Sequence, residues 1–310
     1  MAYLLTESLQ PQQLHNAYRF LKNDKAHWSP GVTREEFDRG MLSYILTLRD
    51  ELASGSYRPL PVRQYAAHKP DGGKRLISTY YLRDKFAQRV IKQVLDPLGE
   101  AIFHHDSYAY RPKRGVQQAV ACVRERVHTG LEWMVDADIR KFFDTVPHRP
   151  LMRLVRGLVR DRDVIRLLEQ MLDVGPHPFS LLRSRRGLLQ GAVISPFLCN
   201  LYLHQFDLAL ARENIPFVRF ADDFILQSQT EEEAKAAYRY AGQLLESFGL
   251  ALHPEKSRVC RASPKVLFLG EPVVGKGKFL WWKHQKKRDK QQDLKIISQA
   301  PLQHKKANFF

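Results

Sequence analysis

Four aspartates in two short apolar segments are the residues of this sequence that most directly indicate a chemical function. Asp222 and Asp223 stand side by side within VRFADDFIL, and Asp136 and Asp138 alternate with apolar residues in EWMVDADI. Adjacent carboxylates repel one another and lose hydration on burial, so a chain tolerates them where a cation lies between them. Carboxylates from two neighbouring strands can hold a pair of Mg²⁺ ions about 3.5–4 Å apart, which neutralise the charge that develops in phosphoryl transfer. The pattern predicts such a site, although an Asp-Asp pair alone is also typical of an exposed turn.

The composition predicts a polyanionic partner. The 310 residues carry 49 Lys and Arg against 33 Asp and Glu, a formal charge of +16. A protein this basic usually faces nucleic acid, and a basic protein without that role is the alternative. The three cysteines are far apart and form no CxxC pair, which argues against a disulfide framework or zinc site and fits a reducing compartment. The N-terminus does not resemble a signal peptide and no apolar run is long enough to span a bilayer, so we expect a cytoplasmic protein without membrane contact.

Hydrophobic spacing predicts helices and hairpins in a mixed order. Helical periodicity or start and stop signals mark residues 35–54, 82–98, 116–128, 149–159, 163–172, 195–212 and 230–249. Strand patterns mark residues 132–139, 257–261 and 266–269, and two hairpins are expected to turn at residues 70–73 and 221–223. The βαβ alternation of a parallel sheet is absent, so the sequence predicts the α+β class, an antiparallel sheet with helices on one face.

The segment from Gly275 onward is strongly basic and contains Trp281 and Trp282. Basic residues interleaved with aromatic rings suit contacts to a nucleic-acid backbone and stacking on its bases. A solvated terminal segment, or a domain without its complete core, explains the same composition equally well.

Seven sequence blocks, in order, resemble a reverse transcriptase of the group II intron type over roughly residues 30 to 270. They are KPDGGKRLIS, SYAYRPKRGVQQAV, DADIRKFFDTVPH, RGLLQGAVISPFLCNLYLHQFD, RFADDF, FGLALHPEKSRV and LFLG. The resemblance implies a right-hand polymerase, with fingers over residues 1–130, a palm over 131–272 and a basic tail or thumb stub over 273–310. The implied activity is RNA-directed DNA synthesis, in which a primer 3′-hydroxyl is extended with dNTPs.

The resemblance also implies roles for the acidic residues. Asp138 matches the first metal-binding aspartate, and Asp222 and Asp223 match the paired ones, which together hold two Mg²⁺ ions that Mn²⁺ can replace. Asp136 falls outside the pattern and is expected to accept a hydrogen bond instead. Phe143, five residues after Asp138, matches an aromatic gate that collides with a 2′-hydroxyl and so selects dNTPs; an ordinary core phenylalanine is the alternative.

Further residues match the palm. Gln190 and Gly191 match the block along the template and the incoming base, where a glycine lets another backbone approach closely. Lys256 matches a lysine near the leaving pyrophosphate and could act as a general acid. His104 and His105 have no third ligand at useful spacing, so no metal site is expected there.

Basic residues of the fingers complete the expected site. Lys69, Lys74 and Arg75 flank a Gly-Gly turn and match the end of the fingers that binds the triphosphate, with Arg75 as the preferred clamp because guanidinium pairs with phosphate in a bidentate way. A solvated hairpin tip is the alternative. Arg111 and Arg114 are expected to hold template phosphates.

The biological setting follows less directly from the sequence. WSPGVTREEFD lacks the aspartate of the G-V-D-G segment usual in intron-encoded relatives, and about 40 residues follow the last palm block, fewer than a full thumb needs. SYAYRPKRGVQQAV favours the branch that supplies DNA copies of RNA to a CRISPR integrase complex. A group II intron-encoded enzyme, a free-standing defence reverse transcriptase and a non-polymerising palm that binds RNA are the alternatives. The expected partners are an RNA template, a DNA or RNA primer and dNTPs.

Overall fold

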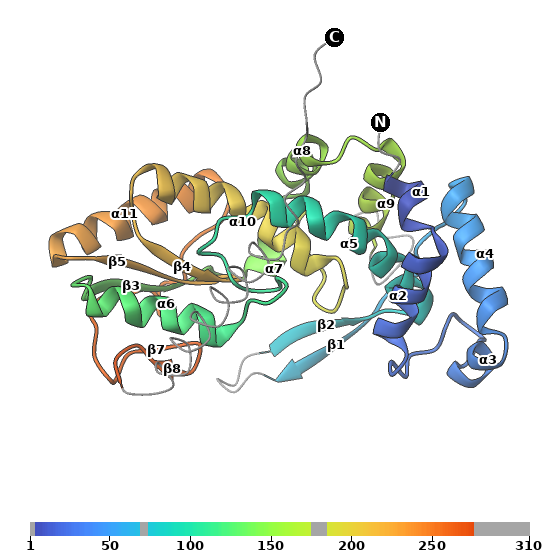
Figure 1. Cartoon of the computed structure of the whole chain (residues 1–310), viewed down its shortest axis with the longest axis horizontal. Helices are drawn as coiled ribbons and strands as arrows, with labels where there is room; N and C mark the ends of the chain where they lie inside the picture. Colours follow the sequence, from blue (N-terminus) through green and yellow to red (C-terminus); the bar gives the residue numbers. More distant parts are fainter. Residues whose placement is uncertain (1–3, 69–73, 175–184, 276–310) are drawn as a thin grey trace, which may run out of the picture.

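A computed structural model describes residues 4–68, 74–174 and 185–275. Figure 1 shows an elongated molecule with the N-terminal helices at one end, a β-sheet at the other and long helices between them. The N-terminal helices are α1 (Leu4–Ser8), α2 (Pro11–Leu21), α3 (Arg34–Arg39) and α4 (Met41–Ser54). The central helices are α5 (Leu82–Ile102), α8 (His148–Leu158), α9 (Arg162–Leu172) and α10 (Ser195–Arg212), with the single turn α7 (Phe142–Thr145) beside them.

The main sheet is antiparallel, as the sequence predicts. Its strands are β3 (Trp133–Asp138), β4 (Phe217–Phe220), β5 (Asp223–Ser228) and β6 (Arg258–Arg261). Their spatial order is β4-β5-β3-β6, and β3 pairs with both β5 and β6 in antiparallel register. A small ribbon of β7 (Leu267–Phe268) and β8 (Glu271–Pro272) follows.

Helices cover both faces of this sheet, whereas the sequence predicted helices on one face. Helix α6 (Val116–His128) lies on one side and α11 (Glu231–Ser247) on the other (Figure 1). In β3, Met134 belongs to the hydrophobic cluster around α6 and Val135 to the cluster around α10 and α11. Consecutive strand residues point to opposite faces, so apolar residues at neighbouring positions show that both faces are buried.

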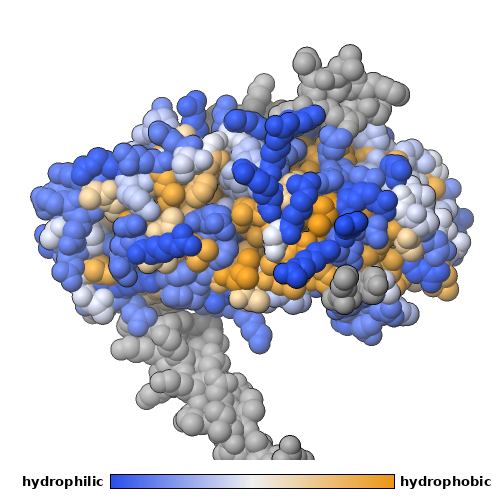
Figure 2. Space-filling model, turned by 90° about the horizontal axis from the view of Figure 1, so that it is seen from above, coloured by the Kyte–Doolittle hydropathy of each residue, from blue (hydrophilic) through white to orange (hydrophobic). Residues whose placement is uncertain are grey.

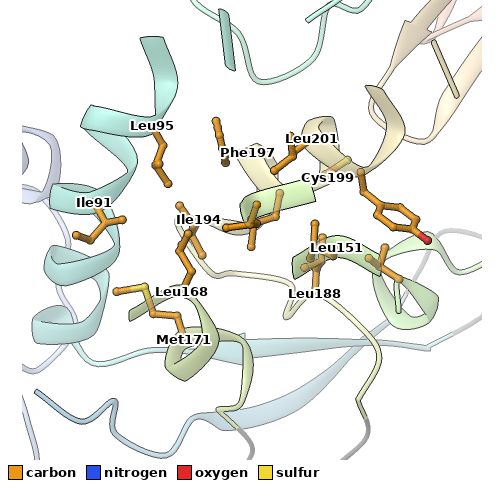
Figure 3. Packing of buried hydrophobic residues seen from close by; sticks show 14 of the residues in the cluster. Ile91, Leu95, Leu151, Leu168, Met171, Leu188, Ile194, Phe197, Cys199 and Leu201 are labelled. Atoms are coloured by element: carbon orange, nitrogen blue, oxygen red, sulfur yellow. The ribbon is translucent and has the colours of Figure 1, made fainter. Parts of the chain in front are cut away.

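The core joins the N-terminal helices to the sheet. One hydrophobic cluster reaches from Leu5 in α1 to Leu250 after α11, across the predicted boundary between fingers and palm. Figure 3 shows side chains of α5, α8, α9 and α10 converging in this cluster, with Leu188 and Ile194 between them. Burying a side chain of this size stabilises the fold by about 1.5–3 kcal/mol. This packing fixes the segment around Leu188 relative to α10.

A two-stranded hairpin extends from the helical part. Its strands are β1 (Arg63–His68) and β2 (Lys74–Thr79), paired antiparallel. The predicted strands are therefore confirmed, while the turn between them lies outside the described residues. The amide of Ser78 in β2 donates to the carbonyl of Gln190 over 2.8 Å, so the hairpin is joined to the segment that precedes α10.

Two predicted helices differ from those in the structure by more than two residues. The helix predicted over residues 35–54 is two helices, α3 and α4, separated at Gly40. Helix α5 continues through Pro97 to Ile102. Gly99 lies so close to the rings of Phe103 and Phe197 that a side chain would not fit there, and this packing stabilises the last turn of the helix. Helix α10 runs over Ser195–Arg212, as predicted. Helix α11 begins with a capping box, in which the Thr230 side chain accepts from the Glu233 amide.

The described part of the chain contains no helix whose length and apolar character would suffice to cross a membrane.

Candidate active site

The structure places the predicted aspartates at one end of the main sheet. Asp138, the last residue of β3, is directly opposite Asp223, the first residue of β5. The Ile139 amide donates to the Asp222 carbonyl over 3.2 Å, which ties the end of β3 to the turn between β4 and β5. Residues directly opposite in an antiparallel pair have Cβ atoms about 4.5–5.5 Å apart. The two acidic segments, some eighty residues apart in the sequence, therefore meet in space.

A buried ion pair holds the turn that carries Asp222. The Arg219 side chain in β4 is fully buried, and its Nε and Nη2 each donate to one carboxylate oxygen of Asp207 over 2.6 Å. The same guanidinium donates to the Asn200 side chain over 3.1 Å and to the Ala221 carbonyl over 3.0 Å. Ala221 has φ +60°, a left-handed conformation that costs a non-glycine residue roughly 1–2 kcal/mol. The Arg219 contact stabilises this conformation from inside the palm.

Asp207→Ala should destabilise the protein by about 3–5 kcal/mol, because it leaves the Arg219 guanidinium buried without its counter-ion. Urea unfolding followed by circular dichroism measures the change. The exposed pair of Glu231 and Lys235, 2.7 Å apart on α11, is the matched control, and Glu231→Gln should leave the stability nearly unchanged because water screens the pair. Equal effects of the two substitutions would contradict the assignment of Arg219 and Asp207 as a buried pair.

The electrostatics of the site favour a bound cation. Burial is the main cause that raises the pKa of Asp222 to about 6, with the nearby Asp138 carboxylate acting in the same direction and Lys256 against it. Burial also raises the pKa of Asp223 to about 7, with Asp138 and Asp222 acting in the same direction. Lys256 Nζ lies 3.0 Å from Oδ2 of Asp138. Carboxylates that crowd one another in this way are stabilised by a divalent ion, so Asp138, Asp222 and Asp223 fit a metal site.

Asp223→Asn should raise the stability of the metal-free protein at neutral pH. A carboxylate whose pKa is higher in the folded than in the unfolded state binds its proton more tightly when folded, so stability falls as pH rises from about 4 to 7. The surrounding protein displaces water from the Asp223 carboxylate, but the residue as a whole is still exposed. Water therefore screens part of the repulsion, and we expect a gain of about 1 kcal/mol.

Thermal unfolding in EDTA between pH 4 and 8 measures this effect. The advantage of Asp223→Asn should be complete above pH 7 and shrink as the pH falls, and Mg²⁺ should reduce it at pH 8. A variant that is less stable than wild type at pH 8 in EDTA would show that the carboxylates are not in conflict.

Asp136 has the hydrogen-bonding role expected of it. Arg258 Nη2 lies 3.2 Å from Oδ2 of Asp136, on the strand that pairs with β3. Burial raises the pKa of Asp136, and the neighbouring Arg258 charge acts against that rise. Asp136 and Asp138 share one face of β3, yet their carboxylates have different basic partners, Arg258 and Lys256.

Phe143, which follows Asp138 by five residues, is brought together with the segment 187–191. The Phe143 ring is partly buried and packs edge-to-face on Phe142 with ring centroids 5.5 Å apart. The Leu188 amide donates to the Phe143 carbonyl. Gly191 has φ +105°, and a Cβ there would lie 2.3 Å from the Ser78 carbonyl oxygen. The close approach expected at Gly191 is therefore present, and the backbone that approaches is that of β2.

Of the other residues predicted to contact nucleotide or nucleic acid, some lie within the described part of the chain and others lie outside it. Lys74 and Arg75 begin β2, three to four residues before the contact of Ser78 with Gln190. Arg114 is partly buried, and its guanidinium lies 5.5 Å from the centroid of the Tyr108 ring. Lys69, Trp281 and Trp282 lie outside the described residues.

Arg111 is a correction. Its side chain is buried, with the guanidinium paired with both carboxylate oxygens of Glu100 at 2.8 and 3.0 Å. It also donates to the carbonyls of His104 and Ser107. A guanidinium engaged in this way is a structural anchor and is not available to template phosphates, so the nucleic-acid contact predicted for Arg111 is wrong.

The structure also corrects the prediction that His104 and His105 have no third potential metal ligand nearby. Asp106 supplies a third potential ligand, with one ligand atom each of His104, His105 and Asp106 all within 4.8 Å of one another. Arg126 Nη2, however, lies 2.7 Å from Oδ2 of Asp106, and a guanidinium on that oxygen competes with a cation. We assign no metal to this cluster.

Sequence reasoning missed the network around Arg219. Ser107, Asn200 and Asp207 are its partners, and all are buried. The available signal is a charged residue in each of two apolar elements: Arg219 within VRF and Asp207 within LHQFDLALA. Two opposite charges in elements that must both be buried indicate an ion pair.

Basic side chains also gather away from the aspartates. Helix α8 contains no acidic residue, and its Arg149, Arg153 and Arg156 are exposed. This helix lies at the top of Figure 1, the side from which Figure 2 is seen, where strongly hydrophilic side chains gather over the middle of the molecule with apolar surface between them. These three exposed arginines contribute to the net charge of +16, as expected of a protein that meets a polyanion.

Two curated proteins are similar to this chain in sequence, over different shares of their own lengths. Protein YkfC of Escherichia coli (strain K12) is 30% identical, over 99% of this chain and 88% of that protein. The group II intron-encoded protein LtrA of Lactococcus lactis subsp. cremoris is 27% identical over 72% of this chain and 37% of LtrA. This chain therefore spans nearly all of YkfC but little more than a third of LtrA.

A solved telomerase structure shares the fold. Telomerase from Candida albicans, in complex with a fragment of telomeric RNA, matches 77% of this chain and 50% of that chain with a TM-score of 0.50 and 14% identity. A chain of a partial Cas6-RT-Cas1–Cas2 complex matches 79% of this chain and 42% of its own length, with a TM-score of 0.48 and 24% identity. At such identity the telomerase match shows the fold alone.

The family described as reverse transcriptase (RNA-dependent DNA polymerase) matches residues 67–273. The matched region contains the paired strands with the three aspartates, Phe143 and the segment at Gln190. This match covers two thirds of the chain, and YkfC is 30% identical to it along nearly its whole length. The chain therefore belongs to the reverse transcriptase family.

Proposed function

We propose that this chain extends the 3′-hydroxyl of a DNA or RNA primer with dNTPs on an RNA template. The observation that carries the proposal is the pairing of Asp138 with Asp223 on adjacent strands, with Asp222 in the turn beside them. Three carboxylates gathered at one end of a sheet fit the requirement of two-metal phosphoryl transfer. Membership of the reverse transcriptase family supports the choice of template and product.

Mg²⁺ is the proposed ion, two per site and replaceable by Mn²⁺, and when bound it would neutralise charge on the attacking and leaving oxygens. Lys256 holds its ammonium 3.0 Å from Asp138. An ammonium in this place can give a proton to the departing pyrophosphate. Its attraction to Asp138 keeps it beside the carboxylates before substrate arrives.

The incoming nucleotide is proposed to lie between the aspartates and β2. Phe143 would then reject the 2′-hydroxyl of an rNTP, and Gln190 and Gly191 would lie along the nascent base pair. Lys74 and Arg75 are proposed to hold the triphosphate from β2, which the Ser78 contact fixes against Gln190. The remaining proposed contacts are Lys69 to the triphosphate, and Arg114, Trp281 and Trp282 to nucleic acid.

Primer extension by the purified chain tests this function. A labelled DNA primer on an RNA template should be extended with dNTPs in Mg²⁺ or Mn²⁺, and not in EDTA. Extension with rNTPs should be much weaker. A chain that binds the primed template but forms no product with either metal would instead be a non-polymerising RNA-binding palm.

A finer proposal concerns the RNA that is copied. The form of SYAYRPKRGVQQAV favours supply of DNA copies of cellular RNA to a CRISPR integrase complex, in the cytoplasm. Co-purification with an integrase, and spacers that derive from transcripts, would support this setting. Stimulation of intron splicing by the chain would support an intron-encoded role, and neither property would favour a free-standing defence enzyme.

A further inference from the structure

Tyr110 combines a rare backbone conformation with an exposed aromatic ring. Its φ is +61°, in the left-handed region, and its side chain is 49% exposed. A bulky residue avoids this conformation because its Cβ approaches the following carbonyl oxygen. Residues held in such conformations gather at functional sites, where the surrounding structure fixes them. The question is what this ring faces.

The backbone places Tyr110 next to the catalytic turn. The Arg219 amide donates to the Asp106 carbonyl, and the Tyr108 amide donates to the Arg219 carbonyl, each over 2.9 Å. The segment therefore runs parallel to β4 along its outer edge. Tyr110 lies two residues beyond Tyr108, as Ala221 lies two residues beyond Arg219, so Tyr110 is beside the turn that carries the paired aspartates.

The chain on both sides of Tyr110 is anchored. The Ala109 carbonyl accepts from Nδ2 of Asn200 over 2.8 Å, and Asn200 also accepts from the buried Arg219. Arg111 is fixed by Glu100, as described above. Anchors on either side hold the backbone of Tyr110 in place while its ring remains half exposed, an arrangement suited to presenting the ring to a ligand.

The order of the strands indicates which ligand the Tyr110 ring faces. In the order β4-β5-β3-β6, the Tyr110 segment lies outside β4, whereas Phe143 follows β3. Across the sheet from the Tyr110 segment, the paired aspartates at the start of β5 come first and Asp138 at the end of β3 comes next, and Phe143 follows Asp138 along the chain. If the incoming nucleotide lies on the Phe143 side, the duplex that has just been synthesised lies on the Tyr110 side.

We propose that Tyr110 contacts the primer–template duplex, its ring packing against the terminal base pair behind the reacting 3′-hydroxyl. This inference rests on the proposed polymerase function. The ligand is an RNA–DNA duplex with a recessed 3′ end, and the contact is independent of sequence because every sugar and base offers an apolar surface to an aromatic ring. Tyr110 holds the duplex in register with the carboxylates; it does not take part in the transfer step.

Binding of a primed template to the full chain tests the proposal. The probe is a fluorescent RNA template with a dideoxy-terminated DNA primer, compared with the same RNA unprimed, and affinity is read from anisotropy. Tyr110→Ala should weaken binding of the primed template about 10-fold, within the range of aromatic contacts to bases. Binding of unprimed RNA should change less than about twofold, and Tyr110→Phe should restore binding because the ring is kept.

Tyr110→Gly separates the ring from the backbone. Glycine adopts positive φ freely, so this variant should fold at least as stably as wild type while binding the primed template as weakly as Tyr110→Ala. Wild-type affinity in both ringless variants would overturn the proposal, as would equal losses on primed and unprimed RNA or failure of Tyr110→Phe to restore binding.

Primer extension by wild type on the same substrate, with an extendable primer, distinguishes this inference from the proposed function. If wild type extends the primer and the ringless variants bind normally, the Tyr110 contact alone fails. If wild type neither binds nor extends the primed template, both fail together.

Discussion

Asp222→Asn should lower the rate of primer extension on the order of 10³-fold, while leaving the fold intact. Asparagine keeps the shape of the side chain but removes the charge that holds a divalent cation, and charge stabilisation by the metal contributes several kcal/mol to phosphoryl transfer. Single-turnover extension of a labelled primer on RNA, in saturating Mg²⁺ and dNTP, measures the effect. The variant should unfold at a higher temperature than wild type in EDTA at pH 8, because the pKa of Asp222 is raised in the folded state.

Asp136→Asn is the matched control for that substitution. It removes a carboxylate two residues before Asp138, on the same face of β3, where the partner is Arg258 at 3.2 Å. Loss of a partly exposed ion pair should change the rate by no more than about fivefold. Comparable losses from Asp136→Asn and Asp222→Asn would mean that general loss of negative charge, and not a specific metal site, explains the effect.

Phe143→Ala should increase the use of rNTPs relative to dNTPs by about 10- to 200-fold, the range expected when a pocket gains or loses a small steric contact. The ring is partly buried and held edge-to-face on Phe142, so it can present a rigid edge to the sugar. Competition between a dNTP and the matching rNTP for a single incorporation, read on a sequencing gel, measures the ratio of kcat/KM values.

Phe143→Tyr should leave discrimination near that of wild type, since the ring and its packing are kept. Phe20→Ala removes an exposed ring from α2, far along the chain from the aspartates, and controls for loss of aromatic surface. Unchanged discrimination in Phe143→Ala would assign Phe143 to the hydrophobic core, the alternative that the sequence left open.

Local patterns were sufficient to predict the strands and the turn that carry the acidic residues, and the type of sheet. Asp138 and Asp223 face each other because both end or begin strands with clear apolar patterns, and the turn at Ala221 is marked by its adjacent carboxylates. The helix over residues 230–249, which depends on a single segment, could likewise be predicted. The α+β class followed from the order of these segments.

Contacts between distant segments could not be predicted. Arg111 looks like an exposed basic residue until Glu100 is brought beside it at the end of α5. The position of that helix end depends in turn on the packing of Gly99 against Phe197, about one hundred residues later. Arg219 needs partners from the segment at Ser107 and from α10. In each case tertiary burial, which no local pattern reveals, decides the role of a charged side chain.

Asp138 is the residue whose position joins the two acidic segments, and its metal binding tests the account most directly. The complex to measure contains the chain, an RNA template, a dideoxy-terminated primer and the next dNTP, with bound Mn²⁺ counted by electron paramagnetic resonance after removal of free ion. The account predicts two Mn²⁺ per wild-type complex and at least one fewer in Asp138→Asn and in Asp222→Asn. The same number of bound ions in wild type and in both variants would contradict it.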